Sequence, residues 1–432
     1  KDCGENASCI YRKTDCIIVE SSSDINLKLG ENWGEYSREH YPRIVIDNNY
    51  HSRTEKGLDM LNKIDKAMEI KWNKINILDS NEYEEIYKAT RENKGFMLLG
   101  RAGTGKSYAI NKINDIMKGE NKRMQKIAFT NTASLNIGGT TIHKFLQLNK
   151  TGHLMYDRIS QIKKSVDLIV IDEISMVSSF LWYRLYQLQD KTGIPFLLVG
   201  DFRQIPPVED MIYEDYREHP TLKLLGGYTY CELETIHRYD DELAEITKDL
   251  EGMNHIKKSQ FQKKIGKVNI CYTNKTRKRI NQLINSKTNK GNILSPRMKS
   301  EDKQVKKGNE MVNENPTQDI YLYDNLPMIS RITHGEEMVN NERFIITKIT
   351  KDMVMLESER PDEDGIPYSH IIGVKLIELQ KYFLCAYCVT THKSQGITIN
   401  GALTIHDWDL MDKKLRYTAI TRAKKLSNIY MI

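Results

Sequence analysis

Long apolar runs are missing from the 432-residue chain. The longest ones, such as Phe96–Leu99 and Phe196–Val199, are far shorter than the ~18 residues that a membrane-spanning helix needs. Proline (10 residues) and glycine (25 residues) are too few for a collagen-like or low-complexity chain. With 39% hydrophobic and 28% charged residues the composition is globular. At roughly 100–200 residues per domain, we expect two to four domains and no membrane segment.

Cysteine and net charge are also modest. Seven cysteines do not make a disulfide scaffold in a chain of this length, so we expect a reducing, intracellular setting. Sixty-four basic residues against 58 acidic ones leave a net charge of +6, which is compatible with a polyanionic partner but does not establish one. The first residue is Lys1 and no secretory apolar segment follows it, so we expect the chain to begin inside a longer polypeptide.

Two sets of strand-like segments predict two α/β units. In each set, continuous apolar segments alternate with helical patterns, as in parallel sheets that are buried on both faces. Between residues 295 and 381, alternating segments separated by Asn, Gly and Pro clusters predict an antiparallel β module inserted into the second unit. We interpret Arg297–Pro316 as a polar surface loop. The apolar segments are residues 95–100, 126–130, 167–172 and 195–201, then 268–274, 383–396, 401–407 and 427–432.

The strongest local signal is the sequence GRAGTGKS, at residues 100–107 between an apolar strand and a helix pattern. Glycines allow such a loop to wrap closely, so that its backbone N–H groups point at phosphates. Lys106 would reach the β and γ phosphates, and the Ser107 hydroxyl would ligate Mg²⁺. The sequence therefore predicts a nucleoside triphosphate site. Its binding residues are Gly100, Ala102, Gly103, Thr104, Gly105, Lys106 and Ser107.

Polar residues also end two further apolar segments. Asp172 and Glu173 end one of them, where parallel sheets present groups to ligands. Asp172 is the candidate for the Mg²⁺ shell, and Glu173 for the general base that activates water. Such a pair could instead cap the next helix, but the phosphate loop upstream favours the chemical interpretation. Asp201 and Gln204 follow the next strand, and Gln204 could orient the attacking water.

Eight motifs in order resemble those of superfamily 1 helicases, over about residues 78–432. The set is similar to the 5′→3′ branch, which includes RecD, Dda, the PIF family and the helicase subunit of herpesvirus helicase–primases. The resemblance implies two RecA-like lobes with Mg-ATP hydrolysed between them. The motifs are GRAGTGKS, TNTASLNI (130–137), TIHKF (141–145), VIDEISMV (170–177), GDFRQIPPV (200–208), ETIHRYDDELAEI (234–246), TTHKSQGITI (390–399) and YTAITRAK (417–424).

The resemblance also assigns residues to roles. Arg238 and Arg422 would stabilise charge on the transferring phosphoryl group. Family members carry a Gln that binds the adenine, whereas this chain has Tyr83 there, which can stack on a base but cannot make the bidentate contact. A strict preference for ATP is therefore not implied. Gly396 would contact the nucleotide, and the strand-binding residues would be Thr130, Thr141, His143, Thr391, His392, Lys393, Ser394 and Gln395.

The first cysteines resemble part of a metal motif. The string DCGENASCIYRKTDC is similar to the end of the zinc motif of PrimPol and of herpesvirus-type primases, with Cys3 and Cys9 as ligands and the first pair upstream of Lys1. That would make the chain the helicase half of a primase–helicase fusion. We expect such a fusion to come from a large DNA virus and to act at a replication site of the host cell. Three ordinary reduced cysteines are the alternative. For Cys385 and Cys388 we favour core packing over metal binding.

The expected domains follow from these motifs. They are a zinc-module tail at 1–25, a connector at 26–78, a first RecA-like lobe at 79–226, a second lobe at 227–295 and 383–432, and an SH3-like β module at 296–382. A pin-type insert to separate strands is expected at about 146–166, with His153, Met155 and Tyr156 as the candidate wedge residues.

The expected function is that of an ATP-dependent 5′→3′ DNA helicase in DNA replication, with single-stranded and forked duplex DNA as partners and a primase domain upstream. One alternative is an ATPase that translocates on RNA or remodels complexes. Another is a scaffold for a primase, against which the intact Lys106, Asp172, Glu173, Gln204 and Arg422 argue.

Overall fold

The computed structural model describes most of the chain and divides it into two compact units, Lys1–Ile70 and Lys71–Ile432. In the first unit β1 (Ala7–Lys13) pairs with β2 (Cys16–Ser21) in an antiparallel hairpin, and α1 spans Glu55–Glu69. Over the described residues, no helix is long and apolar enough to cross a membrane. These residues are 7–13, 16–21, 55–149, 152–207, 216–288, 297–298, 304–307, 310–313, 320–335, 337–362 and 366–432.

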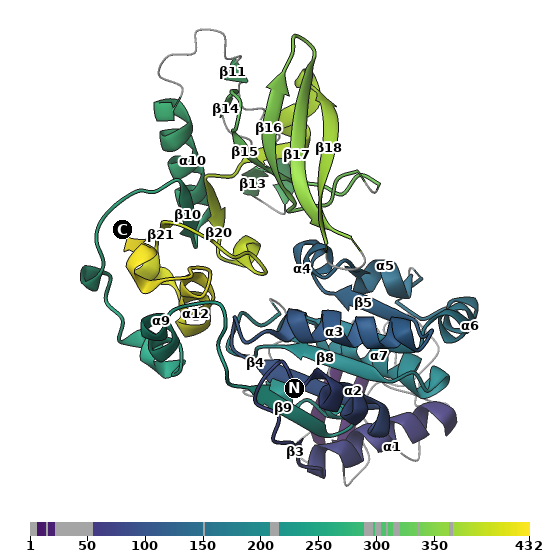
Figure 1. Cartoon of the computed structure of the whole chain (residues 1–432). Helices are drawn as coiled ribbons and strands as arrows, with labels where there is room; N and C mark the ends of the chain where they lie inside the picture. Colours follow the sequence, from purple (N-terminus) through teal and green to yellow (C-terminus); the bar gives the residue numbers. More distant parts are fainter. Residues whose placement is uncertain are drawn as a thin grey trace. The chain divides into compact units, whose positions relative to one another are not determined.

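The second unit begins with a parallel sheet of seven strands, in the order β3-β9-β4-β8-β7-β5-β6 (Figure 1). Its central strands β4, β7 and β8 are continuous apolar segments, and the helices α2 and α3 pack against them. The strands are β3 (Asn73–Lys74), β4 (Gly95–Gly100), β5 (Met124–Ala128), β6 (Thr140–Thr141), β7 (Leu168–Asp172), β8 (Phe196–Gly200) and β9 (Thr229–Leu233). The helices are α2 (Tyr83–Glu92), α3 (Lys106–Gly119), α4 (Asn131–Asn136), α5 (Ile142–Leu146), α6 (Tyr156–Ser165), α7 (Ser179–Thr192) and α8 (Pro220–Leu225).

The first lobe extends beyond both of its predicted boundaries. The strand β9 lies after residue 226, yet it pairs with β4 in this sheet, and β3 pairs with β9 although it precedes residue 79. In β9 buried residues alternate with half-buried ones, because it lies near the sheet edge. It therefore lacks the continuous apolar run by which the central strands were predicted.

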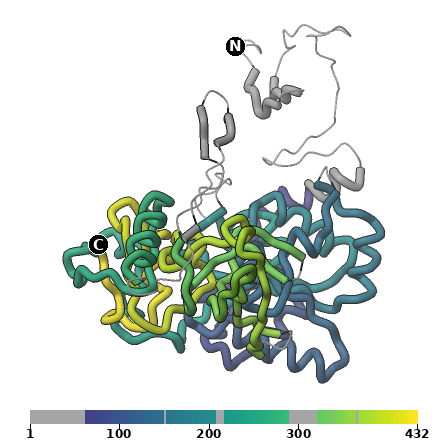
Figure 2. The backbone as a smooth tube through the Cα atoms, turned by 90° about the horizontal axis from the view of Figure 1, so that it is seen from above, coloured from purple at the N-terminus to yellow at the C-terminus, as the bar shows by residue number. Residues whose placement is uncertain are grey.

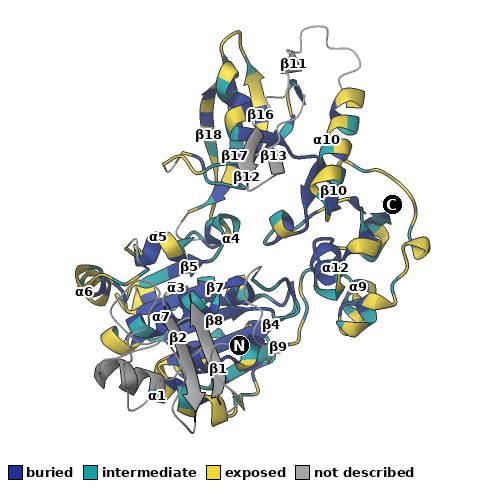
Figure 3. Cartoon of the chain, turned by 180° about the vertical axis from the view of Figure 1, so that it is seen from behind, coloured by how far each residue is buried: buried dark blue, intermediate teal, exposed yellow. Residues whose placement is uncertain are grey.

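A second parallel sheet, in the order β20-β10-β21-β22, forms the other lobe. Its strands come from both sides of the β module in sequence, so the lobe is built from two separate stretches of chain, coloured teal-green and yellow in Figures 1 and 2. Figure 3 shows its strands as largely buried. The elements are α9 (Asp241–Ile246), β10 (Val268–Cys271), α10 (Asn274–Thr288), β20 (Cys388–Thr390), β21 (Leu403–Ile405), α12 (Lys413–Ile420) and β22 (Ile429–Met431).

The predicted β module is present as an antiparallel sheet in the order β18-β17-β16-β15-β19, with Phe344, Leu356 and Phe383 in its core. In β17 buried residues alternate with more exposed ones, as the sequence pattern predicts. The segment predicted as a loop, Arg297–Pro316, contains short strands. Bounds are β11 (Arg297–Met298), β12 (Gln304–Lys307), β13 (Glu310–Asn313), β14 (Ile320–Tyr321), β15 (Pro327–Ser330), β16 (Arg343–Ile349), β17 (Met353–Pro361), β18 (Pro367–Lys375), α11 (Leu379–Tyr382) and β19 (Phe383–Cys385).

The boundary between the β module and the second lobe also differs from the prediction. The segment that begins at Phe383 was expected to lie wholly in the second lobe, but β19 pairs antiparallel with β15 of the module. The chain enters the second lobe with β20, at Cys388. Both strands are buried along their whole length and mostly apolar, so the sequence pattern does not show where the chain changes sheets.

Candidate functional site

The loop between β4 and α3 has the geometry that phosphate binding requires. Gly103 and Gly105 have φ angles of +86° and +81°, in the left-handed region that glycine alone enters without strain. A Cβ atom on Gly105 would also lie 2.3 Å from the hydroxyl oxygen of Ser80. The loop leads directly into the N-terminus of α3, whose free backbone N–H groups favour an anion.

Lys106 is held at the first turn of this helix. Its Nζ donates hydrogen bonds to the backbone carbonyl oxygens of Gly100 (2.7 Å) and Arg101 (3.0 Å). Burial lowers the pKa of Lys106, while the carboxylates of Asp201, Glu173 and Asp172 act in the opposite direction. A buried ammonium surrounded by partial negative charge is prepared to receive the stronger charge of a phosphate.

The acidic pair lies at the carboxyl end of β7. Burial and the neighbouring Glu173 carboxylate raise the pKa of Asp172 to about 7. Glu173 has a φ angle of +53°, a conformation that is unfavourable for a residue with a Cβ atom. The backbone N–H of Glu173 donates to Oδ1 of Asp172 at 2.9 Å. Both residues line the cavity described next.

All six predicted catalytic residues line one cavity of about 460 Å³. Oε1 of Gln204 is buried there and accepts no hydrogen bond from a described residue. Burial lowers the pKa of Arg238, and burial together with Arg238 lowers the pKa of Arg422 to about 10, so Arg422 stays charged at neutral pH. The six are Lys106, Asp172, Glu173 and Gln204 from the first lobe, Arg238 from the segment after β9, and Arg422 from the second lobe.

The predicted nucleotide-binding residues divide into two groups. Ala102, Gly103, Gly105, Lys106, Ser107 and Gly396 line the cavity. Gly100 and Thr104 do not line it. The Thr104 hydroxyl instead donates to the carbonyl of Arg101 at 2.9 Å, within the loop. Tyr83 is not a lining residue and packs edge-on against Tyr108, with ring centroids 6.3 Å apart.

Tyr108 itself lines the cavity, with 45% of its surface exposed, and the sequence analysis missed it. An exposed aromatic ring beside a phosphate loop is suited to stacking on a base. Its position directly after Ser107 is the signal that could have identified it. The cavity is also lined by Ala133, Asn136 and His237, which the sequence analysis did not select.

The residues that would hold Mg²⁺ fit that ion. Ser107 and Asp172, from two different elements, both line the cavity and offer the hydroxyl and carboxylate oxygens that Mg²⁺ prefers. Burial and the charge of Glu173 raise the pKa of Asp172, and the charge of Lys106 acts in the opposite direction, as a bound cation would.

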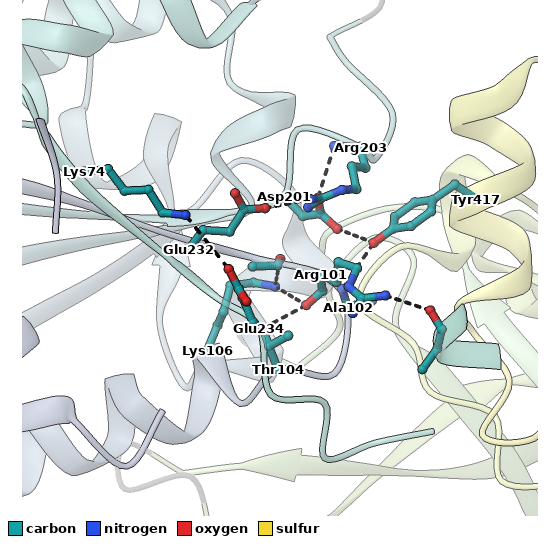
Figure 4. A network of polar contacts seen from close by, with 12 residues as sticks. Lys74, Arg101, Ala102, Thr104, Lys106, Asp201, Arg203, Glu232, Glu234 and Tyr417 are labelled. Carbon is teal, nitrogen blue, oxygen red and sulfur yellow. Dashed lines mark hydrogen bonds and ion pairs between the residues drawn. The ribbon is translucent and has the colours of Figure 1, made fainter. Parts of the chain in front are cut away.

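A buried tyrosine connects the lobes behind this cavity (Figure 4). The hydroxyl of Tyr417, on α12 of the second lobe, donates to Oδ2 of Asp201 at 2.6 Å and accepts from the N–H of Ala102 at 3.4 Å. Arg203 holds the other carboxylate oxygen of Asp201 at 3.4 Å. Arg101 adds a second link between the lobes by donating to the carbonyl of Ala244 at 2.7 Å. The phosphate loop is therefore bonded to the second lobe through two successive residues.

We expect Tyr417→Phe to lower the free energy of unfolding by about 1.5–3 kcal/mol, because a buried carboxylate loses a charge-assisted hydrogen bond. Tyr239→Phe is the matched control, since among the described residues the buried Tyr239 hydroxyl bonds only the neutral hydroxyl of Thr247; we expect a loss of about 0.5–1.5 kcal/mol there. Urea unfolding followed by circular dichroism measures both. Equal losses of stability in the two variants would contradict the role of Asp201 as a charged acceptor for the Tyr417 hydroxyl.

The predicted strand-binding residues lie in several environments. The hydroxyls of Thr130 and Thr141 cap α4 and α5 by accepting from the N–H groups of Ala133 and Lys144. His143 lies beside Phe129, with ring centroids 6.0 Å apart. Thr391, Ser394 and Gln395 are buried, whereas His392 is exposed and Lys393 is half-buried. Whether they bind nucleic acid stays a prediction.

The side chains of the two predicted zinc ligands, Cys3 and Cys9, lie outside what the structure describes. Cys3 lies outside the described residues, and Cys9 is in β1, where only the backbone is described. No cluster of three or more potential metal ligands occurs in the described part of the chain. The zinc module, the primase fusion and the viral source stay predictions. Cys385 and Cys388 are both buried, in β19 and β20 of different sheets.

Comparisons with known proteins agree with this geometry. Residues 83–271 match the model of an AAA domain. The structure of Pif1 helicase from Candida albicans is 18% identical, with a TM-score of 0.59 over 83% of this chain and 94% of that one. The structure of Bacteroides Pif1 bound to ssDNA is 17% identical, with a TM-score of 0.57 over 82% and 92%. No curated protein matches the chain in sequence.

The resemblance inferred from the eight motifs is therefore confirmed at the level of fold. The two parallel sheets and the separate antiparallel sheet correspond to the predicted architecture. The chain has the fold of the Pif1 helicases, and residues 83–271, which run from the first lobe into the second, match an AAA domain.

Proposed function

We propose that this protein is an ATP-dependent DNA helicase that moves 5′→3′ along one strand and acts in DNA replication. The observation that carries the proposal is the single cavity in which Lys106 and Glu173 of the first lobe face Arg422 of the second. A site shared between two lobes couples the state of a nucleotide to the distance between those lobes. The AAA-domain match and the Pif1 fold support the same enzyme class.

The residues that line the cavity have different roles in phosphoryl transfer. Glu173 accepts a proton from the attacking water, which the amide oxygen of Gln204 orients; among the described residues this oxygen has no hydrogen-bond partner. Lys106 and the N–H groups of the loop hold the phosphates, and Arg238 and Arg422 offset the charge that develops on the transferring group. Ser107 and Asp172 would hold Mg²⁺, which would supply further neutralisation of that charge.

DNA as the partner is supported by the relatives. Similar structures include Bacteroides Pif1 bound to ssDNA, Bacteroides Pif1 in complex with ADP-AlF3 and ssDNA, and two coordinating Pif1 helicases that unwind DNA at forked dsDNA. Direction of travel and the role in replication rest on the resemblance of the motifs.

Unwinding of partial duplexes with a 5′ or a 3′ single-stranded tail tests the proposal. We expect ATP-dependent opening of the 5′-tailed DNA alone, and none with Glu173→Gln, which keeps the shape of the side chain but cannot accept the proton. Opening of the 3′-tailed DNA alone would contradict the direction. Hydrolysis stimulated by RNA but not by DNA would favour the RNA-translocating alternative, and no hydrolysis at all would favour the scaffold.

A further inference from the structure

A second cavity lies on the second lobe and shares no lining residue with the nucleotide cavity. Its volume is about 570 Å³, within the range of sites that take a ligand or the side chains of a partner. Its floor is apolar. Ile246, Ile256, Phe261 and Leu426 are only partly buried there and pack against the core of the lobe, to which the fifth floor residue, Ile429, belongs. Partly exposed apolar side chains that gather in one hollow favour an interaction site.

Hydrogen bonds to the rest of the lobe hold the wall that contains residues 255–262. The indole N–H of Trp408 donates to the carbonyl of Ile256 at 2.9 Å. The N–H of Met431, in β22, donates to the carbonyl of Gln262 at 3.2 Å. The cavity is therefore formed before a partner arrives, and binding does not have to order this wall.

Three pairs of lysines adjoin the lining residues of this cavity. Two pairs directly follow Ile256 and Gln262, and the third directly precedes Leu426. All six side chains are exposed. We call them the lysine rim, which consists of Lys257, Lys258, Lys263, Lys264, Lys424 and Lys425.

Most of the charge of the lysine rim is not paired. Among the described residues, only Lys258 of the rim forms an ion pair, with Asp409 at 2.6 Å. The Nζ of Lys264 lies 5.3 Å from the centre of the Tyr430 ring, which lines the cavity, so this ammonium group stands directly beside it. Glu242, on α9, is the one carboxylate among the described lining residues. The surroundings of the cavity therefore favour a partner with negative charge.

We propose that this cavity binds an acidic peptide segment of a partner protein, with one or two apolar side chains on the floor and carboxylates beside the lysine rim. An apolar anchor in a central hollow with charges around it is the usual anatomy of a protein–protein contact. The phosphates of a nucleic acid would also be attracted by the rim. Its bases, however, bind by stacking on aromatic rings, whereas four of the five floor residues are aliphatic.

An array of octapeptides tests this chemistry with the full chain. Its members carry Ile, Leu or Phe at two central positions and Asp or Glu at the others. Two matched arrays replace the acidic residues by Lys or the central residues by Ser. We expect binding to members of the first array alone, because both the anchor and the charge are needed. An absence of binding to every member of the first array, or equal binding to the Ser array, would overturn the proposal.

Variants of the chain locate the contact, with the strongest peptide of the array labelled and its affinity measured by fluorescence anisotropy. Ser427 is an exposed lining residue, so Ser427→Trp fills the cavity and should weaken binding at least about tenfold. The double variant Lys263→Glu with Lys264→Glu should weaken binding about tenfold and remove most of its salt dependence. ATP hydrolysis should stay at the wild-type rate in both, since neither changes a residue of the nucleotide cavity.

Lys267→Glu is the matched control. Lys267 is an exposed lysine of the same segment, but it neither lines the cavity nor adjoins a lining residue, so binding should stay within about twofold of the wild type. Wild-type affinity in Ser427→Trp, or an equal loss in Lys267→Glu, would overturn the site. If Ser427→Trp weakened the binding of a single-stranded oligonucleotide as much as that of the peptide, the cavity would belong to nucleic acid and the peptide assignment would be wrong.

Discussion

Arg422→Ala should slow DNA-stimulated ATP hydrolysis by about 10³–10⁵-fold, the range in which arginine fingers contribute. The guanidinium of Arg422 lines the cavity from the second lobe. It is held there by hydrogen bonds to the carbonyls of Thr418 (2.9 Å) and Ile397 (3.3 Å). The charge is thus fixed before a nucleotide arrives and needs no reorganisation during the reaction. Steady-state hydrolysis at saturating DNA, together with the affinity for a fluorescent ATP analogue, measures the effect on kcat and on binding separately.

The control for this experiment is Arg416→Ala. Arg416 lies on α12, and Arg422 follows the C-terminus of that helix. Like Arg422, Arg416 donates to main-chain carbonyls, those of Trp408 (3.2 Å) and Met253 (3.3 Å). It does not line the cavity, so its loss should affect stability but leave hydrolysis within about threefold, as for a residue that makes no contact with the transition state. Equal losses of hydrolysis in the two variants would show that Arg422 acts only by holding the lobe together.

Lys106→Ala should lower hydrolysis by about 10²–10³-fold, the cost of removing one preorganised donor from a transition state. The strand should still bind, because Lys106 is not among the predicted strand-binding residues. Lys112→Ala, on the exposed side of the same helix beside Asp115, is the control and should leave hydrolysis unchanged. Hydrolysis above a tenth of the wild-type rate in Lys106→Ala would place the phosphates elsewhere.

The first lobe and its half of the site were predictable because their signals are local. The phosphate loop, Lys106 and the pair Asp172–Glu173 each follow an apolar strand directly, so their position at the carboxyl edge of the sheet follows from the sequence. Arg238 and Arg422 have no such signal, and only the order of the motifs identified them. The structure places both in the same cavity.

Contacts between distant segments were not predictable. Tyr417 and Asp201 are 216 residues apart in sequence, and nothing near either residue indicates the partner. Tyr83 was selected as the base-stacking residue by its spacing from the phosphate loop. The ring that lines the nucleotide cavity is instead that of Tyr108, which packs against Tyr83.

The change of sheets between β19 and β20 has a mechanical consequence. Ala386 and Tyr387 alone join the two strands; the N–H of Ala386 donates to the carbonyl of Pro327 in the β module, and the carbonyl of Tyr387 accepts from the N–H of Asn269 in the second lobe, each at 2.8 Å. A two-residue connection that is hydrogen-bonded at both ends restricts the movement of one sheet relative to the other. We expect the β module and the second lobe to turn together as one body, so that the step along the strand is described by a single hinge coordinate rather than two.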